Sequence, residues 1–174
     1  MIIAFDNTFL SLVLNPGTAP TPNPATGEPI EYCKERVEAL VDSHSKRGDT
    51  VLIPTPCLSE LLCIVPDIEK AVGEINRSVV FDLAPFDARC AIDLADATRK
   101  AVASGDKRSG VKTGWNEVKF DRQIAIIAKV NGAEVFYTDD GNQSEFAKLL
   151  GITVRHTWDL DLPPEYAQVP LFEE

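Results

Sequence analysis

The sequence predicts an α/β fold, a three-layer α/β/α sandwich around a parallel sheet of roughly five strands. Short apolar segments at residues 2–5, 51–53, 78–83, 133–138 and 152–154 alternate with longer segments of helical periodicity. Continuous apolar strands are typical of parallel sheets that are covered on both faces. Strands that alternate with helices favour right-handed crossovers, which place neighbouring strands in parallel.

Residues that start and stop helices flank several of the helical segments. Thr55 is expected to cap a helix that ends at Pro66. Pro85 should start a later helix, and Asn142 should cap the last one in a capping-box-like arrangement with Glu145. Apolar residues at helical spacing predict further helices at residues 8–14, 32–46, 68–75 and 117–131.

The length of 174 residues favours a single domain over residues 1–174. Two segments interrupt the pattern of strands and helices. Residues 15–29 are rich in Pro, Gly and Thr and predict a long loop, which is either a functional element or a passive surface insertion. From about residue 158 the chain is acidic and contains prolines, so we expect an irregular tail.

Composition predicts a soluble protein of the cytoplasm. No signal peptide opens the sequence, and no apolar run approaches the ~18 residues that suggest a membrane span. The cysteines form no CxxC pair, and we expect all of them to be reduced and buried: Cys33, Cys57, Cys63 and Cys90. The scarcity of histidine argues against a zinc site. The net charge of −10 argues against a protein that coats nucleic acid, but not against an enzyme that acts on nucleic acid through metal ions.

Four acidic residues carry the functional hypothesis. Asp6 and Asp140 follow apolar strands, and Glu60 and Asp121 are expected in the first turns of two helices. In a parallel α/β fold the strand carboxyl ends and the N-termini of the crossover helices lie at one edge, where ligands bind. The four carboxylates can therefore converge, although they are far apart in the sequence. Gathered carboxylates repel one another and lose hydration, so such a cluster favours a bound cation.

Carboxylate oxygens are the ligands that Mg²⁺ and Mn²⁺ prefer. Such ions can activate a water and neutralise charge on a phosphodiester. Each acid taken alone has a simpler explanation, because acids near a helix start stabilise the helix dipole and Asp is a common turn residue. The four together indicate a metal site more strongly than any single member does.

Several segments, in order, resemble the PIN-domain family of metal-dependent ribonucleases, which includes VapC-type toxins. They are IIAFDNT, PTPCLSELL, FDRQIAIIAKVNGA, VFYTDD and FAKLLGI, and they span the chain from Asp6 to Val154. The resemblance implies a five-stranded α/β/α sandwich with a nuclease site that needs Mg²⁺ or Mn²⁺ and acts on RNA. It also implies a homodimer and, for the toxin of a toxin–antitoxin pair, an antitoxin partner.

The resemblance implies four catalytic metal ligands: Asp6, Glu60, Asp121 and Asp140. Glu60 is either a ligand or the base that positions the attacking water. The family's Thr-x-Asp motif falls on Thr138 and Asp140, which favours Asp140 over Asp139 as the fourth ligand. The candidates for residues that contact these ligands rather than the metal are Thr138, Asp139 and Asn142.

A polar, basic loop at residues 105–114 and the helix that follows it supply candidates for phosphate contacts. They are Lys107, Arg108, Lys112, Lys119 and Arg122. The alternative is that these residues form only a solvated basic face. This loop and the loop at 15–29 make the chain longer than compact toxin members, which weakens the toxin assignment more than the nuclease assignment.

Two other functions compete with the nuclease hypothesis. Residues 5–8, Phe-Asp-Asn-Thr, faintly resemble the nucleophile motif of haloacid-dehalogenase-type phosphatases, and residues 138–141 resemble its late acidic motif. That family needs a second Asp where Thr8 stands. The other alternative is a non-catalytic PIN-like module that binds RNA or protein, and the presence of all four acids weighs against it.

Overall fold

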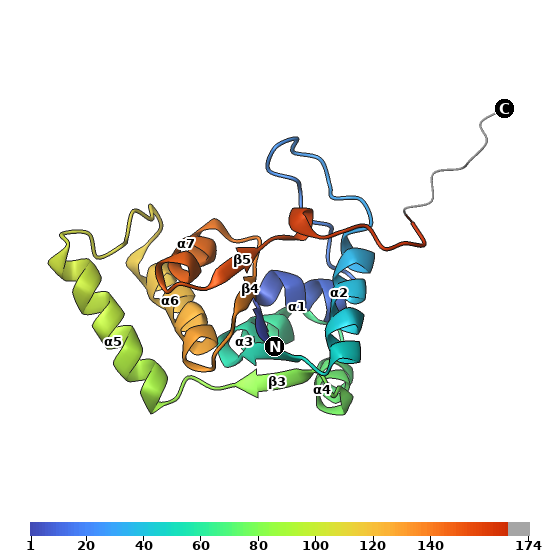
Figure 1. Ribbon diagram of the computed structural model, residues 1–174, viewed down its shortest axis with the longest axis horizontal. Coiled ribbons are helices and arrows are strands. Elements are labelled where there is room, and N and C mark those ends of the chain that lie inside the picture. The colour runs from blue at the N-terminus through green and yellow to red at the C-terminus, as the bar shows by residue number, and fades with distance from the viewer. Residues whose placement is uncertain (167–174) are drawn as a thin grey trace.

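A computed structural model describes residues 1–166 and contains a five-stranded parallel sheet in the order β3-β2-β1-β4-β5 (Figure 1). The strands are β1 (Ile2–Phe5), β2 (Thr50–Pro54), β3 (Phe81–Ala84), β4 (Val135–Tyr137) and β5 (Thr153–Arg155). In the centre of the sheet, Ile3 pairs with Val51 on one side and with Val135 on the other. The predicted α/β sandwich with a five-stranded parallel sheet is therefore confirmed.

Helices follow the strands in the alternating order that the sequence predicted. They are α1 (Asn7–Leu14), α2 (Cys33–Arg47), α3 (Thr55–Ile64), α4 (Ile68–Arg77), α5 (Ala88–Ala103), α6 (Trp115–Val130) and α7 (Gly141–Leu149). A short 3₁₀ helix, η1 (Thr157–Asp159), follows β5. None of the helices within residues 1–166 combines the length and the apolar character that crossing a membrane requires.

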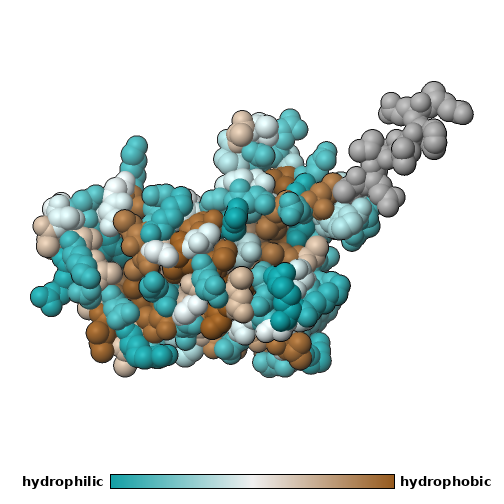
Figure 2. All heavy atoms as spheres, viewed as in Figure 1, coloured by the Kyte–Doolittle hydropathy of each residue, from teal (hydrophilic) through white to brown (hydrophobic). Residues whose placement is uncertain are grey.

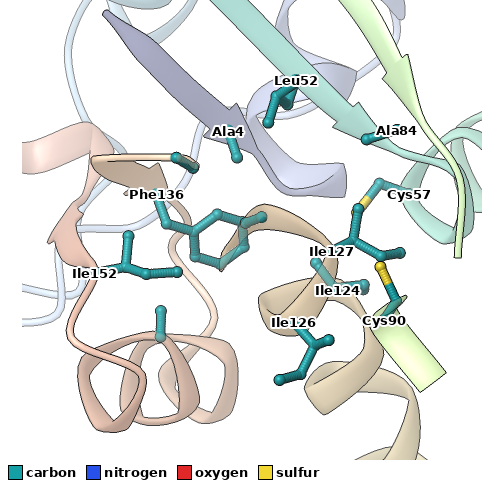
Figure 3. Close-up of a cluster of buried hydrophobic side chains, with 13 residues drawn as sticks. Ala4, Leu52, Cys57, Ala84, Cys90, Ile124, Ile126, Ile127, Phe136 and Ile152 are labelled. Carbon is teal, nitrogen blue, oxygen red and sulfur yellow. The ribbon is translucent and has the colours of Figure 1, made fainter. Parts of the chain in front are cut away.

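The two faces of the sheet bury separate cores because strand side chains alternate in direction. On one face Phe136 of β4 packs with Ile124 and Ile127 of α6 and with Ile152, as Figure 3 shows. On the other face Phe5 and its neighbours pack against α1 and α2. Strands buried on both faces explain the continuous apolar runs in the sequence.

Three predicted helix starts are wrong. Thr55 is not the cap of α3, because β2 runs directly into the helix and Pro54 occupies the capping position. Pro85 does not begin α5; the helix starts at Ala88 after Asp87, whose carboxylate accepts a hydrogen bond from the Cys90 amide. In each case a neighbouring residue already occupies the position at which the chain turns into the helix.

The third error concerns Asn142. The side chain that caps α7 is that of Asp140, whose Oδ1 accepts the Gln143 amide at 2.8 Å, and Asn142 lies inside the helix. Asn142 does not form the predicted capping box with Glu145. A cap carboxylate can accept from the third amide of the helix without a reciprocal glutamate, so the pattern from Asn142 to Glu145 was misleading.

The loop at 15–29 contains no helix and only one isolated β bridge, between Pro22 and Pro29. After η1 the chain continues without a regular element through residue 166, and the rest of the predicted acidic tail lies outside the described residues. All four cysteines are free thiols, and Cys33, Cys57 and Cys90 are buried. Cys63 is exposed, so its predicted burial is wrong: it lies on the outer side of α3.

Candidate active site

Asp6 lies between β1 and α1 and is almost completely buried. Its Oδ1 accepts the Phe9 amide at 2.9 Å, so the carboxylate caps α1. Its Oδ2 accepts the hydroxyl of Thr138 at 2.6 Å. The strand passes into the helix without a loop, and this junction fixes the carboxylate at the carboxyl edge of the sheet.

Thr138 joins two of the predicted site acids. Its hydroxyl donates to Asp6, and the same oxygen accepts the backbone amide of Asp140 at 3.0 Å. Because Thr138 is fully buried, these two hydrogen bonds connect the ends of β1 and β4 away from solvent. The spacing of the Thr-x-Asp motif is therefore explained by the geometry of the turn between β4 and α7.

Glu60 and Asp121 lie beyond the first turns of their helices, which begin one and two residues earlier than predicted. Glu60 is the sixth residue of α3, and Asp121 is the seventh residue of α6, because both helices begin earlier than expected. Asp121 is buried and Glu60 is half-buried. The first-turn prediction is wrong for both, although both side chains lie near the other acids, as their electrostatic influence on one another shows.

Burial and the charges of neighbouring carboxylates raise the pKa values of several acids in this cluster. Burial raises the pKa of Asp6 to about 7, against opposing hydrogen bonds of which those from Thr138 and Phe9 are the strongest. Burial, followed by the charges of Asp140, Glu117 and Glu60, raises the pKa of Asp121 to about 6. Burial and the charge of Asp140 also raise the pKa of Glu60. Carboxylates that resist ionisation in this way mark a site that a cation would stabilise.

The charge effects show which acids face one another. The charge of Asp140 raises the pKa values of both Asp121 and Glu60, and the charge of Glu60 adds to the effect on Asp121, which places these three in one electrostatic group. Asp6 joins this group through the Thr138 hydroxyl to Asp140. Cys57 is near acids of both pairs: burial raises the pKa of its thiol, and the charges of Asp6 and Glu60 add to that effect.

The donor set of this cluster fits a hard divalent cation, but the side chains do not form a closed coordination shell. Across residues 1–166, no group of three or more His, Cys, Asp or Glu side chains is arranged to hold a metal ion. The chemistry of the cluster nevertheless suits Mg²⁺ or Mn²⁺, because every donor is an oxygen. Asp121 also keeps a buried Oδ2 that has no hydrogen-bond partner. Metal binding at these four acids remains a prediction.

Sequence analysis missed Gln143, which is buried in α7 beside the acids. Its Nε2 lies 3.4 Å from Oδ1 of Asp121, and its backbone amide is the one that Asp140 caps. Its Oε1 has no partner. The position three residues after the cap could have signalled this role, because that residue's amide must face the cap carboxylate.

Two of the predicted supporting residues contact other parts of the protein. Asp139 accepts hydrogen bonds from the backbone amide and the hydroxyl of Thr157, both at 2.8 Å, and so fixes the chain after β5. Asn142 reaches toward the start of α6, with its Nδ2 3.4 Å from the Thr113 hydroxyl and 3.5 Å from the Glu117 carboxylate. Thr138 is thus the supporting residue that contacts two of the acids directly.

The basic residues divide into an exposed set and one buried member. The exposed set consists of Lys107, Arg108, Lys112 and Lys119. Lys107 and Lys119 both lie over the ring of Trp115, at 4.9 Å and 6.0 Å from its centroid. Arg122 is only 4% exposed, so the prediction of a surface phosphate contact does not describe its environment.

We expect Thr138→Val to lower the free energy of unfolding by about 1–3 kcal/mol, because it leaves buried polar groups of Asp6 and Asp140 without their partner. Urea unfolding at neutral pH measures this change. The matched control is Thr153→Val, an exposed threonine in β5, which should change stability by less than about 0.5 kcal/mol. Equal effects of the two substitutions would mean that the Thr138 hydroxyl does not connect the two strand ends.

Comparison with known proteins supports the fold. No protein-family model matches the sequence, and no curated protein matches it. Among solved structures, one chain in the crystal structure of VapBC2 from Rickettsia felis bound to a DNA fragment from their promoter is similar to this chain. The match has a TM-score of 0.56 and 14% sequence identity, and it covers 90% of this chain and 98% of that one. The similarity therefore supports the same overall fold for the two chains.

Proposed function

We propose that this protein is a metal-dependent endoribonuclease that hydrolyses RNA phosphodiester bonds. The observation that supports it most is the group of acids at the carboxyl edge of the sheet, where burial and like charges raise the pKa values of Asp6 and Asp121. Holding acids in such an environment destabilises the protein unless a cation or proton neutralises them. The fold that this chain shares with the similar VapBC2 chain supports the proposal.

Asp6, Asp121 and Asp140 would hold Mg²⁺ or Mn²⁺, with Glu60 as a further ligand or as the group that orients water. Such an ion supplies an activated water and neutralises charge on the phosphodiester. The protein's part is to position the oxygens. The Phe9 amide and the Thr138 hydroxyl fix Asp6, the start of α7 fixes Asp140, and the Gln143 amide group restrains Asp121.

The exposed basic residues between α5 and α6 supply the surface on which RNA phosphates would lie. The overall charge of −10 repels nucleic acid, so local positive charge is needed near the site. Lys107, Arg108 and Lys112 lie in the loop that precedes α6, the helix that carries Asp121. These residues would contact phosphates without selecting a base sequence.

A cleavage assay tests the proposal. We expect the wild-type protein to cut single-stranded or structured RNA with added Mn²⁺, and to stop when a chelator is added. We expect Asp121→Asn to reduce the cleavage rate at least ~100-fold, because it removes a charged oxygen from the site. The matched control is Glu145→Gln, an exposed acid in α7 that pairs with Lys148, and its rate should equal that of the wild type.

Other outcomes of the same assay would overturn the proposal. Release of phosphate from a small phosphate ester, without cleavage of RNA, would indicate the phosphatase alternative with Asp6 as nucleophile. RNA binding without cleavage, unchanged by Asp121→Asn, would indicate a binding module. Cleavage that survives both the chelator and Asp121→Asn would show that the acids are not the active site.

The assembly of this protein forms part of the same proposal. The similar solved chain belongs to a complex named VapBC2, which supports a protein partner of the antitoxin type for this chain. A homodimer is the assembly that the family resemblance implies. Co-expression with the product of a short adjacent reading frame, followed by size-exclusion chromatography with light scattering, measures both the partner and the oligomeric state.

A further inference from the structure

Residues of α5, α6 and α7 line a cleft on the side of the molecule where α5 lies, at the left edge of Figure 1. The cleft has a volume of about 500 Å³. Its apolar lining comes from all three helices and consists of Ala97, Ala101, Ile126, Phe146, Leu149 and Leu150. Hydrophobic atoms are exposed in this region of the molecular surface in Figure 2. None of the four acids of the candidate active site lines the cleft.

Arg122 contributes a buried positive charge to the wall of this cleft. Its guanidinium carbon lies 5.7 Å from the centroid of the Trp115 ring and 5.0 Å from that of Phe146. Its Nη2 donates to the hydroxyl of Ser109 at 2.8 Å. Its Nη1 is buried and has no hydrogen-bond partner.

This environment is costly for an arginine. A buried cation is normally paired with an acid and has its remaining donors satisfied, and a buried unpaired donor costs free energy. No acid lies within ion-pair distance of Arg122 among the salt bridges of the described residues. The two aromatic rings offset part of this cost, and an anion beside Nη1 would offset the rest.

We propose that the cleft between α5, α6 and α7 binds a small amphipathic anion, whose carboxylate or phosphate monoester group pairs with Arg122 while its apolar body fills the cleft. The volume lies in the range of small-molecule sites, and the lining has the expected character, mostly apolar with one placed polar group. Because Nη1 has no access to solvent, binding includes a small displacement of the side chains that cover it.

The other charges around the cleft are compatible with an anion. Asp96 and Lys100 pair with each other at 2.7 Å on the exposed side of α5. Asp93 and Lys129 also line the cleft, one acid and one base. The lining residues therefore carry three positive and two negative charges, Arg122 included. The positive charge in excess is that of the buried Arg122, so an anionic group is attracted toward the inner wall of the cleft.

Calorimetric titration with octanoate and octyl phosphate tests the proposal, and ¹H–¹⁵N NMR mapping locates the bound probe. We expect both probes to bind the wild-type protein and to shift the signals of α5, α6 and α7. Octan-1-ol should bind about tenfold more weakly or worse, because a hydrogen bond to a charged group is lost. Comparing octanoate with octyl phosphate shows which head group Arg122 prefers, and inorganic phosphate alone should not bind detectably.

Two variants test separately the contribution of the Arg122 charge and that of the open volume of the cleft. Arg122→Met should weaken octanoate binding about tenfold or more while leaving octan-1-ol binding unchanged. Ala97→Trp fills the cleft from α5 and should abolish binding of both probes. The matched control is Arg89→Met, an exposed arginine that pairs with Asp87 at the start of α5 and does not line the cleft. This variant should bind like the wild type.

Three results would overturn the proposal. Octanoate and octan-1-ol binding with equal affinity would mean that Arg122 serves only as a structural partner of Trp115 and Phe146. Displacement of octanoate by a short RNA would assign the cleft to the nucleic-acid surface. NMR shifts outside α5, α6 and α7, or binding that persists in Ala97→Trp, would place the probe elsewhere. None of these readouts depends on nuclease activity.

Discussion

Asp6→Asn should reduce metal-dependent RNA cleavage by at least ~100-fold and still give a folded protein. Asparagine retains an Oδ1 that can accept the Phe9 amide, so the cap of α1 is kept. The substitution removes a negative charge and one carboxylate oxygen, which a hard cation needs. The rate of RNA cleavage in Mn²⁺ and the affinity for Mn²⁺, measured by calorimetry, should fall together.

The control for this prediction is Asp82→Asn, which changes an exposed acid on the edge strand β3. Its cleavage rate and its affinity for Mn²⁺ should equal those of the wild type. A normal rate in Asp6→Asn, with the circular dichroism spectrum of the folded protein, would exclude Asp6 from catalysis. Loss of cleavage with undiminished affinity for Mn²⁺ would instead indicate that Asp6 acts on the substrate.

The metal-free protein should lose stability as the pH rises from about 4 to about 7. The unfolded Asp6 carboxyl ionises near pH 3.8, whereas the folded one does so near pH 7. Between these values the folded state binds more protons, so the free energy of unfolding falls with increasing pH. A shift of this size corresponds to a change on the order of 4 kcal/mol. Above about pH 7 the loss is complete.

Comparison with Asp6→Asn isolates this effect from other titrations. Burial lowers the pKa of His44, which adds stability as the pH rises through part of the same range. The pKa of Asp87 is lowered to about 2 by the Cys90 amide and Arg89, so its contribution changes only below pH 4. The difference in unfolding free energy between wild type and Asp6→Asn, measured in urea with a chelator, removes both contributions.

We expect Asp6→Asn to be the more stable protein at pH 8 without metal, and Mn²⁺ to stabilise the wild type more than the variant. Binding to the folded state alone adds a free energy of RT ln(1 + [Mn²⁺]/Kd) to its stability, which is larger for the protein with the lower Kd. A wild type that is as stable as Asp6→Asn across pH 4–8 would show that the Asp6 carboxylate is not strained by burial.

The fold and the edge that carries the acids could be predicted because they depend on long patterns. Continuous apolar strands and intervening helices determine a parallel sheet, and the topology then places Asp6 and Asp140 at one edge. The errors arose where a single contact decides the local structure. Asn142 has the sequence signature of a cap, but the turn after β4 gives that role to Asp140.

Side-chain environment could not be predicted where it depends on residues distant in sequence. Arg122 belongs to a basic segment, and only the packing of Trp115 and Phe146 around it shows that it is buried. The contact between Gln143 and Asp121 could not be predicted from the sequence, because it forms only when α7 packs against α6. Such contacts join different elements, and hydrophobic periodicity carries no information about them.

The hydrogen bonds that hold Asp6 and Asp140 also limit how these acids can meet a cation. Both oxygens of Asp6 already accept a hydrogen bond, and one oxygen of Asp140 is committed to the start of α7. Neither carboxylate is therefore free to bind an ion through two oxygens without hydrogen bonds. Such bidentate coordination is common in the large, flexible shell of Ca²⁺. Single-point attachment with retained water suits the compact octahedral shell of Mg²⁺, so we expect a site built on these acids to favour Mg²⁺ over Ca²⁺.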